Sequence, residues 1–177
     1  MSTTSYLIVQ AIGFVGTILF FASFQFKENK TLFRVQFFSY LFYTTHLLLL
    51  GATTGAISYI LNTVRSLCLG SSSDLLRSRR MGALLCLLQL GVLWVTWDGW
   101  ISILPVAANI ASTVGGYTHN ARKIRIAGMF INSPLWIIYD IIVGSWAGIA
   151  DEVVSEISMI ISVARFGWKG LEEESDS

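Results

Sequence analysis

The stretch that decides the fold is residues 35–64, VQFFSYLFYTTHLLLLGATTGAISYILNTV, which contains no aspartate, glutamate, lysine or arginine. A helix that crosses the roughly 30 Å hydrocarbon core of a bilayer needs about 20 apolar residues. The stretch therefore forms either one long tilted helix or a tight hairpin of two spans. Gly51-Ala-Thr-Thr-Gly55 interrupts it with small, flexible residues near its centre, which favours the hairpin.

The rest of the chain has the same character. Further uncharged stretches are residues 1–26, 81–97, 99–121 and 126–139. Hydrophobic residues make up 54% of the chain and charged residues 13%, about half the charged share of a soluble domain. This composition excludes a soluble globular enzyme, and a net charge of +1 gives no basic field for a nucleic-acid partner. The first stretch lacks a basic leader and a cleavage site of small residues, so we expect a retained span.

Charge asymmetry sets the number of spans and their orientation. A second hairpin, over residues 124–168, is indicated by Gly144-Ser-Trp-Ala-Gly148. With single spans at about 5–24, 81–97 and 100–118, the total is seven. All lysines and arginines then lie on one side, as cytoplasmic loops require, with Arg65 and Arg165 at inner helix ends where they reach the interface. The opposite side holds the acids Asp98, Asp151 and Glu152. We therefore predict an integral multi-pass protein with an outer N-terminus and a cytoplasmic C-terminus.

A weak internal repeat fits this layout. A shift of 93 residues places Gly51 on Gly144 and Tyr43 on Trp136, whereas a shift of 100 places Arg65 on Arg165. The difference predicts extra helical turns or a longer outer loop near residues 149–156. The fold class is therefore all-α, with two parallel three-helix repeats joined by a linker helix (3+1+3). The expected divisions are residues 1–73 for the first repeat, 74–98 for a loop and the linker helix, 99–169 for the second repeat, and 170–177 for an acidic disordered tail.

Short motifs resemble two membrane families. Ile12-Gly13-Phe14, the Trp136-Ile-Ile-Tyr139 step and the 3+1+3 layout resemble the SWEET/PQ-loop (MtN3-type) sugar carriers. Ser39-Tyr40, Tyr43, His46 and Gly51, together with the chain length and the acidic tail, resemble the YgjV-type bacterial inner-membrane proteins more closely. The resemblance implies a multi-pass protein of the bacterial inner membrane. The Pro-Gln pair that ends the first helix of each PQ-loop repeat is absent: the corresponding residues are Ser23-Phe24-Gln25-Phe26 and Gly116-Tyr117-Thr118-His119.

Polar and aromatic residues within the spans indicate a binding site, because polar groups are costly in hydrocarbon. On the predicted helices they form stripes that face one central cavity. The predicted substrate-binding residues are Tyr43, His46, Asn62, Asn109, Asn132, Trp136, Tyr139 and Asp140. Tyr43 and Trp136 are expected to stack on the ligand in a site between the midplane and the outer face, with His46 and Tyr139 hydrogen-bonding it.

Ordinary packing explains the same residues differently. Small and hydroxylated residues commonly join transmembrane helices, His46 is as well explained as a structural histidine, and Asp140 as a solvated residue near the interface. Trp136 and Tyr139 also fit a core or an interfacial aromatic belt. If His46 serves binding, it is either neutral or holds a proton through Asp140. If Trp136 is a ligand contact, its replacement by alanine abolishes binding with little effect on melting.

Two functions remain in view. The preferred one is a small-solute transporter of SWEET-like architecture, for a sugar or another neutral polar metabolite. The alternative is a non-transporting membrane protein with an interaction, assembly or lipid-contact role, which the missing Pro-Gln pairs favour. Catalytic motifs and metal-ligand spacings are absent from the sequence, so we expect neither an enzyme nor a cofactor. The expected partners are the lipid bilayer and a small polar solute, with a homo-oligomer left open. A solvent-sized cavity would discriminate between the two functions.

Overall fold

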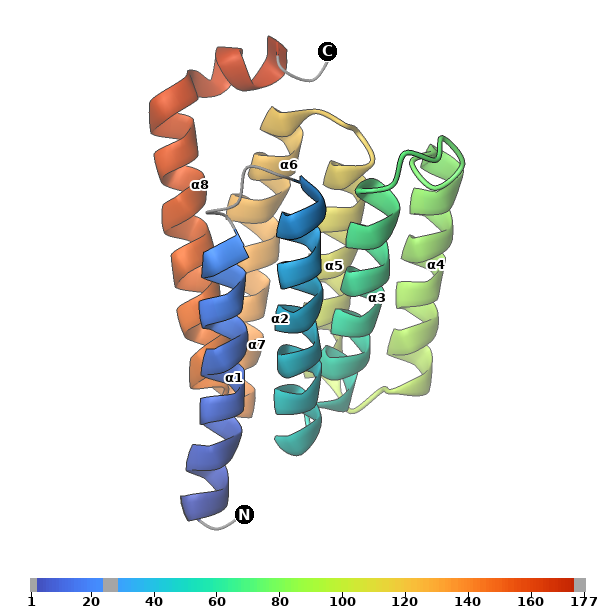
Figure 1. The fold of residues 1–177 in the computed structure, drawn as a ribbon. Helices are drawn as coiled ribbons and strands as arrows, with labels where there is room; N and C mark the ends of the chain where they lie inside the picture. Colours follow the sequence, from blue (N-terminus) through green and yellow to red (C-terminus); the bar gives the residue numbers. More distant parts are fainter. Residues whose placement is uncertain (1–2, 24–28, 174–177) are drawn as a thin grey trace.

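The computed structural model describes residues 3–23 and 29–173. Every regular element in these ranges is helical, which confirms the all-α class (Figure 1). The elements are α1 (Thr3–Ser23), α2 (Asn29–Leu49), α3 (Thr53–Leu69), α4 (Arg79–Val95), the 3₁₀ turn η1 (Trp100–Ser102), α5 (Ile103–Gly116), α6 (Ala121–Ala127), the π-helical η2 (Gly128–Asn132), α7 (Ser133–Val143) and α8 (Trp146–Glu173).

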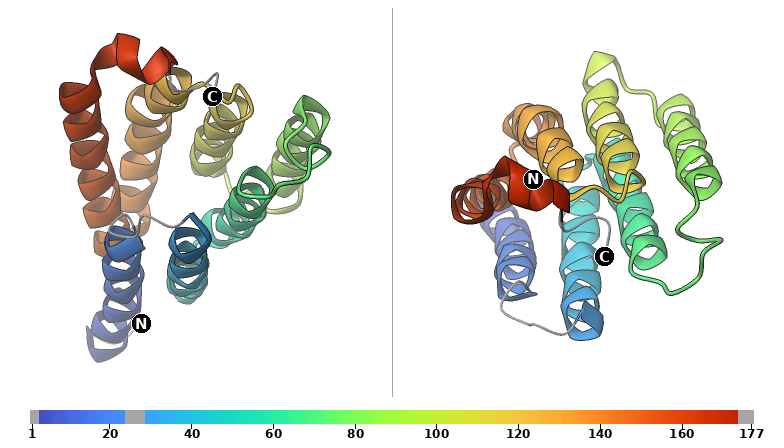
Figure 2. Two further views of the ribbon diagram at one scale, coloured as in Figure 1. Left: turned by 45° about the horizontal axis from the view of Figure 1, so that its top comes forward. Right: turned by 90° about the horizontal axis from the view of Figure 1, so that it is seen from above.

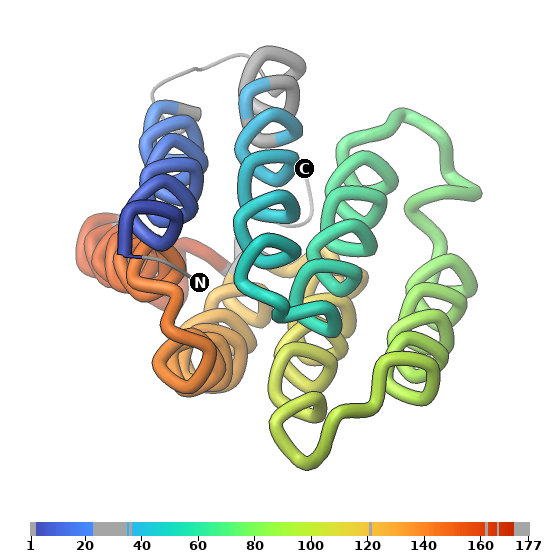
Figure 3. Tube along the Cα trace, turned by 90° about the horizontal axis from the view of Figure 1, so that it is seen from below, coloured from blue at the N-terminus to red at the C-terminus, as the bar shows by residue number. Residues whose placement is uncertain are grey.

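The helices run alternately up and down along one direction, with α6, η2 and α7 forming one continuous rod. Each helix packs on the next around a ring: α1 on α2, α2 on α3, α3 on α5, α5 on α7, α7 on α8, and α8 back on α1. Helix α4 lies outside this ring, where it packs against α3 and α5 (Figures 2 and 3). The described part of the chain begins at one end of the bundle and finishes at the other.

Two matching turns join α2 to α3 and α7 to α8. Gly51 (φ 79°) and Gly144 (φ 73°) adopt the left-handed conformation that glycine accepts without strain. The amide of Gly51 bonds the carbonyl three residues earlier (3.0 Å), and that of Ala52 bonds the carbonyl five residues earlier (2.9 Å). Gly144 and Ser145 repeat these bonds at 3.4 and 2.8 Å. Both turns are therefore Schellman motifs, and both predicted helix breaks are present, 93 residues apart.

Of the two predicted alternatives for residues 149–156, extra helical turns or a longer outer loop, the loop is wrong, because these residues lie within α8. The spacing of 93 therefore continues along α8, and Arg65 corresponds in position to Ser158 and not to Arg165. Helix α8 bends sharply at Gly167 (φ 68°, ψ 160°), and the segment after it crosses the top of the bundle in Figure 1. Residues 170–173 of the predicted tail belong to this helical segment, and residues 174–177 lie outside the described residues.

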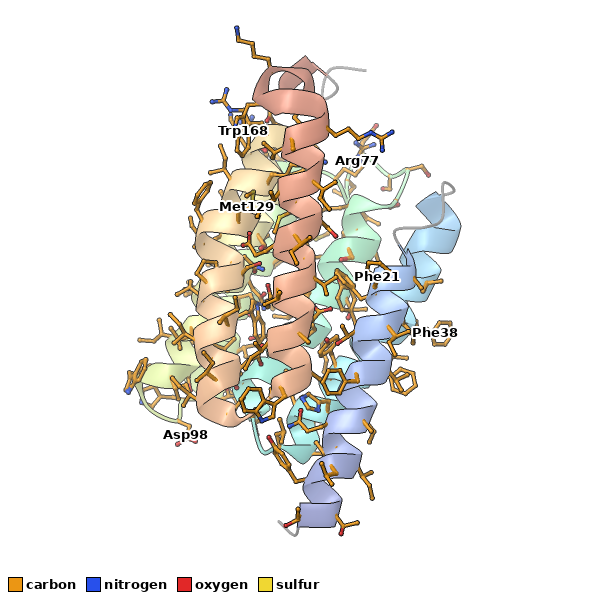
Figure 4. The ribbon with its side chains drawn as sticks, turned by 90° about the vertical axis from the view of Figure 1, so that its left-hand side faces the viewer. Phe21, Phe38, Arg77, Asp98, Met129 and Trp168 are labelled. Atoms are coloured by element: carbon orange, nitrogen blue, oxygen red, sulfur yellow. The ribbon has the colours of Figure 1, made fainter. Side chains whose placement is uncertain are left out.

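The outer surface of the bundle is apolar. Phe21 and Phe38 project away from the helices (Figure 4), with exposed fractions of 52% and 55%. Arg77 lies toward the top of the bundle and Asp98 toward the bottom. By length and composition, two helical segments of the described residues can cross a membrane: Thr3–Ala22 and Arg122–Val143. An apolar surface of this kind suits contact with lipid.

Candidate functional site

A cavity of about 610 Å³ lies inside the ring of helices. Its lining comes from α2, α3, α5, α8 and the α6–η2–α7 rod, together with Phe20 of α1. The lining extends from Tyr59 and Trp136 deep in the bundle to Leu69 and Gly116, at the ends of α3 and α5. The cavity therefore opens toward the top of Figure 1, where the α3–α4 and α5–α6 loops lie. Its volume is typical of a small-molecule site.

Amide side chains form one wall of the cavity. Asn62 and Asn132 line it, as does Trp136, whereas Asn109 is fully buried beside them. The Asn109 Oδ1 atom accepts hydrogen bonds from Asn62 Nδ2 (2.8 Å) and from Trp136 Nε1 (3.3 Å). Its Nδ2 donates to the Ser58 carbonyl (3.2 Å). Asn109 therefore positions two lining residues, and Asn62 Oδ1 has no hydrogen-bond partner among the described residues.

An aromatic layer forms the floor of the cavity. The ring of Tyr59 stacks on Tyr43, with centroids 5.3 Å apart and planes at 17°, and lies 4.8 Å from the ring of Trp136. Trp136 in turn meets Tyr139 edge-on at 5.6 Å. Tyr59 and Trp136 form this layer, because both line the cavity, whereas Tyr43 and Tyr139 lie below it and do not. The layer therefore separates the open half of the bundle from the half below it.

Hydrogen bonds between helices close the lower half. Tyr43 bonds Thr17 of α1 and donates to the Ala147 carbonyl at the start of α8 (3.1 Å). The Tyr139 hydroxyl accepts from the amide of Gly55 at the start of α3 (3.1 Å). Each predicted residue here is thus engaged in a contact between helices.

His46 belongs to the same lower half and is fully buried. Its Nδ1 lies 2.8 Å from the Val9 carbonyl and its Nε2 lies 2.8 Å from Ser145 Oγ. A carbonyl only accepts, so Nδ1 carries the hydrogen. Ser145 Oγ accepts from the Gly148 amide (3.1 Å) and also contacts the Asp140 carboxyl group, so its single hydrogen points either to Nε2 or to that carboxyl group. These partners suit a neutral imidazole, the first of the two alternatives, because neither ring nitrogen bonds Asp140 directly.

The comparison with known families settles the broad identity. The sequence model of the Imp-YgjV family, described as a bacterial inner membrane protein, matches residues 7–169. The chain belongs to this family. No curated protein and no solved structure matches it significantly. The YgjV resemblance and the inner-membrane location are thereby confirmed, while the likeness to SWEET/PQ-loop carriers stays an expectation.

Four charged residues of this Imp-YgjV protein line the cavity, and of these the sequence places only Arg65 on a polar stripe that faces it. They are Arg65, Arg125, Asp151 and Glu152. The prediction that Asp151 and Glu152 lie on the outer face is wrong: only 5% and 6% of these side chains are exposed. Arg65 lies inside the bundle, with Nη1 3.5 Å from the Asn109 carbonyl. The internal repeat does predict that the two acids are buried, because a shift of 93 residues places them on Ser58 and Tyr59, which face inward.

The structure thus divides the eight predicted binding residues into two groups. Asn62, Asn132 and Trp136 line the cavity and Asn109 supports them. Tyr43, His46, Tyr139 and Asp140 lie in the lower half of the bundle, which we call the closed half. Ligand binding by either group stays a prediction. No group of three or more histidine, cysteine or acidic side chains suited to a metal occurs within residues 3–23 and 29–173.

Replacement of His46 tests the closed half. His46→Leu removes the hydrogen bonds to the Val9 carbonyl and to the Ser145 hydroxyl, at a cost of about 0.5–1.5 kcal/mol for each. His46→Gln retains both a donor and an acceptor, so we expect a much smaller loss. The measurement is the unfolding free energy of both purified variants in detergent. Equal losses for Leu and Gln would contradict a role that depends on these two hydrogen bonds.

Proposed function

We propose that this inner membrane protein transports a small polar solute by alternating access. The observation that carries the proposal is the cavity, which places charged and amide side chains within a mostly apolar lining, is large enough for a metabolite, opens at one end of the bundle and is closed at the other by buried hydrogen bonds. A carrier needs a central site that communicates with one side at a time. The alternative, a purely structural or interaction role, does not require an internal cavity of about 610 Å³.

In this proposal the chain crosses the membrane seven times, as two parallel three-helix repeats joined by α4. The matched Schellman turns support the repeat. So do the positions 93 residues apart on α3 and α8 that both line the cavity, such as Asn62 with Ser155 and Arg65 with Ser158. The contacts of α3 with α5 and of α8 with α1 are then the two equivalent boundaries between repeats. Substrate sites of parallel-repeat transporters lie at such boundaries.

The proposed orientation places the open end of the cavity in the cytoplasm, because Arg77 lies at that end and Asp98 at the other. Single cysteines are introduced at Arg77, Ser155 and Asp98 in a background without Cys68 and Cys86. An impermeant maleimide is expected to label Arg77→Cys and the cavity position Ser155→Cys from the cytoplasmic side, and Asp98→Cys from the outside. Labelling of positions 77 and 98 from the same side would show that α4 (Arg79–Val95) does not cross the membrane, and would contradict the seven-span layout.

Uptake into reconstituted vesicles tests transport itself. Vesicles with the folded protein are offered radiolabelled sugars and other small polar metabolites, and accumulation above protein-free vesicles is expected for at least one class. Ser155→Trp, which fills the cavity, should stop this uptake. Leu90→Trp, on the exposed face of α4, is the matched control and should not. Folded protein that takes up none of these solutes would favour the structural or interaction role.

A further inference from the structure

Three of the four charged residues of the cavity lie on opposite walls, and the fourth, Arg125, lines it from α6. In the ring of helices, α3 lies between α2 and α5, whereas α8 lies between α7 and α1. These two helices therefore face each other across the cavity (Figure 2). Arg65 lines it from α3, and Asp151 and Glu152 line it from α8. The positive charge of Arg65 thus stands across the cavity from two carboxyl groups.

Such an arrangement is costly in an empty, buried site. A charge removed from water is stabilised only by a partner of opposite charge or by hydrogen bonds. Asp151 is 5% exposed, and its Oδ1 atom has no hydrogen-bond partner among the described residues. The protein partners of these three groups are neutral: the Asn109 carbonyl for Arg65, Tyr43 for Asp151 and Ser133 for Glu152. A sugar would likewise offer hydroxyl groups but no opposite charge. A solute with separated charges would compensate both walls.

We propose that the cavity binds a zwitterion of the amino-acid type, with its carboxylate toward Arg65 and its ammonium group toward Asp151 and Glu152. This inference rests on the proposed transport function and names its substrate class. An arginine guanidinium is suited to a carboxylate because it donates two parallel hydrogen bonds. The two acids supply acceptors for an ammonium group, which has three donors and no acceptor.

The remaining space suits the side chain of such a solute. The charged groups of an amino acid occupy a small part of about 610 Å³. Tyr40, Tyr59 and Trp136 contribute aromatic surface to the same lining. These faces can receive apolar groups and also stabilise a nearby ammonium ion. The site therefore fits an amino acid with a medium or large side chain better than glycine.

Ligand-induced thermal stabilisation of the purified full-length protein tests the substrate class. The probes are L-leucine, L-phenylalanine and L-glutamine, each compared with its amide, its N-acetyl derivative and D-glucose. We expect at least one free amino acid to raise the melting temperature. Its amide, which lacks the negative charge, and its N-acetyl derivative, which lacks the positive charge, should bind at least tenfold more weakly. Stabilisation by glucose alone, by none of the probes, or equally by all three forms of an amino acid would overturn the inference.

Two variants then assign the walls. Arg65→Gln should shift the preference from the free amino acid to its amide, and the double variant Asp151→Asn/Glu152→Gln should shift it to the N-acetyl derivative. Arg77→Gln and Asp98→Asn, at exposed positions outside the cavity, are charge-matched controls that should keep the original preference. A purely structural role would weaken all ligands together, and that result would contradict the assignment.

The uptake assay separates the two proposals. Vesicles that accumulate glucose but no amino acid would overturn the substrate class and leave transport standing. Vesicles that accumulate nothing, from a protein that amino acids still stabilise, would overturn transport and leave the zwitterion site standing.

Discussion

Replacement of Trp136 by alanine is expected to lower the free energy of unfolding by about 3–5 kcal/mol, the usual cost of removing a large buried aromatic side chain. Only 1% of Trp136 is exposed, and its ring packs between Tyr59 and Tyr139. Its indole N–H also donates to Asn109. The variant should therefore melt at a much lower temperature and lose ligand binding as well. The sequence pattern alone predicts loss of binding with melting unchanged, and the burial of the ring alters that expectation.

Trp136→Phe separates the two roles of this residue. Phenylalanine keeps an aromatic ring in the layer but removes the N–H donor, so we expect a loss of stability of about 1 kcal/mol, comparable to one hydrogen bond. Both variants are compared with the unaltered protein by unfolding in detergent and by ligand-induced stabilisation. A Trp136→Ala protein with unchanged melting would show that the aromatic layer does not support the bundle.

The fold follows from the sequence largely because two simple patterns agree. Charge-free stretches predict apolar helices, and the glycines at positions 51 and 144 predict where they turn, since both adopt positive φ. The π-helical turn Gly128–Asn132 was not predicted. It comes shortly before Pro134, which lacks an amide hydrogen and therefore removes one helical hydrogen bond. The sequence shows where the proline is, but it does not predict that the helix forms a π-helical turn before it.

The candidate site was predicted only in part, because helical periodicity gives the inward face of a helix and not the depth of a residue. Trp136 and Tyr139 share one face of α7, yet Trp136 reaches the cavity and Tyr139 lies in the closed half. Asp151 and Glu152 were missed for a different reason. Acids near a predicted helix start resemble solvated residues, and only the packing of α8 against α7 and α1 shows that they are buried.

Alanine at Gly148 is expected to destabilise the closed half by about 1–3 kcal/mol, the usual cost of overpacking. A Cβ atom at this position would overlap the carboxyl group of Asp140. Gly55, 93 residues earlier, is equivalent, because a Cβ atom there would overlap the ring of Tyr139. Gly91→Ala in α4 is the matched control: nothing lies within 4 Å of its Cβ position, and alanine favours a helix. Thermal unfolding of the three variants measures the difference.

The same substitution also tests whether the closed half opens during transport. If the proposed alternating access separates α8 from α7 on this side, an added methyl group at Gly148 disfavours the closed state more than the open one. The population should shift accordingly. Ser155→Cys, which the closed half shields from the outside, should then become reactive to an impermeant maleimide added outside when Gly148→Ala is present, and not when Gly91→Ala is present. If Gly148→Ala melts like the Gly91→Ala control, the tight contact at Gly148 is contradicted. If it is also labelled like that control, the proposal that Gly148 lies where the closed half opens is contradicted.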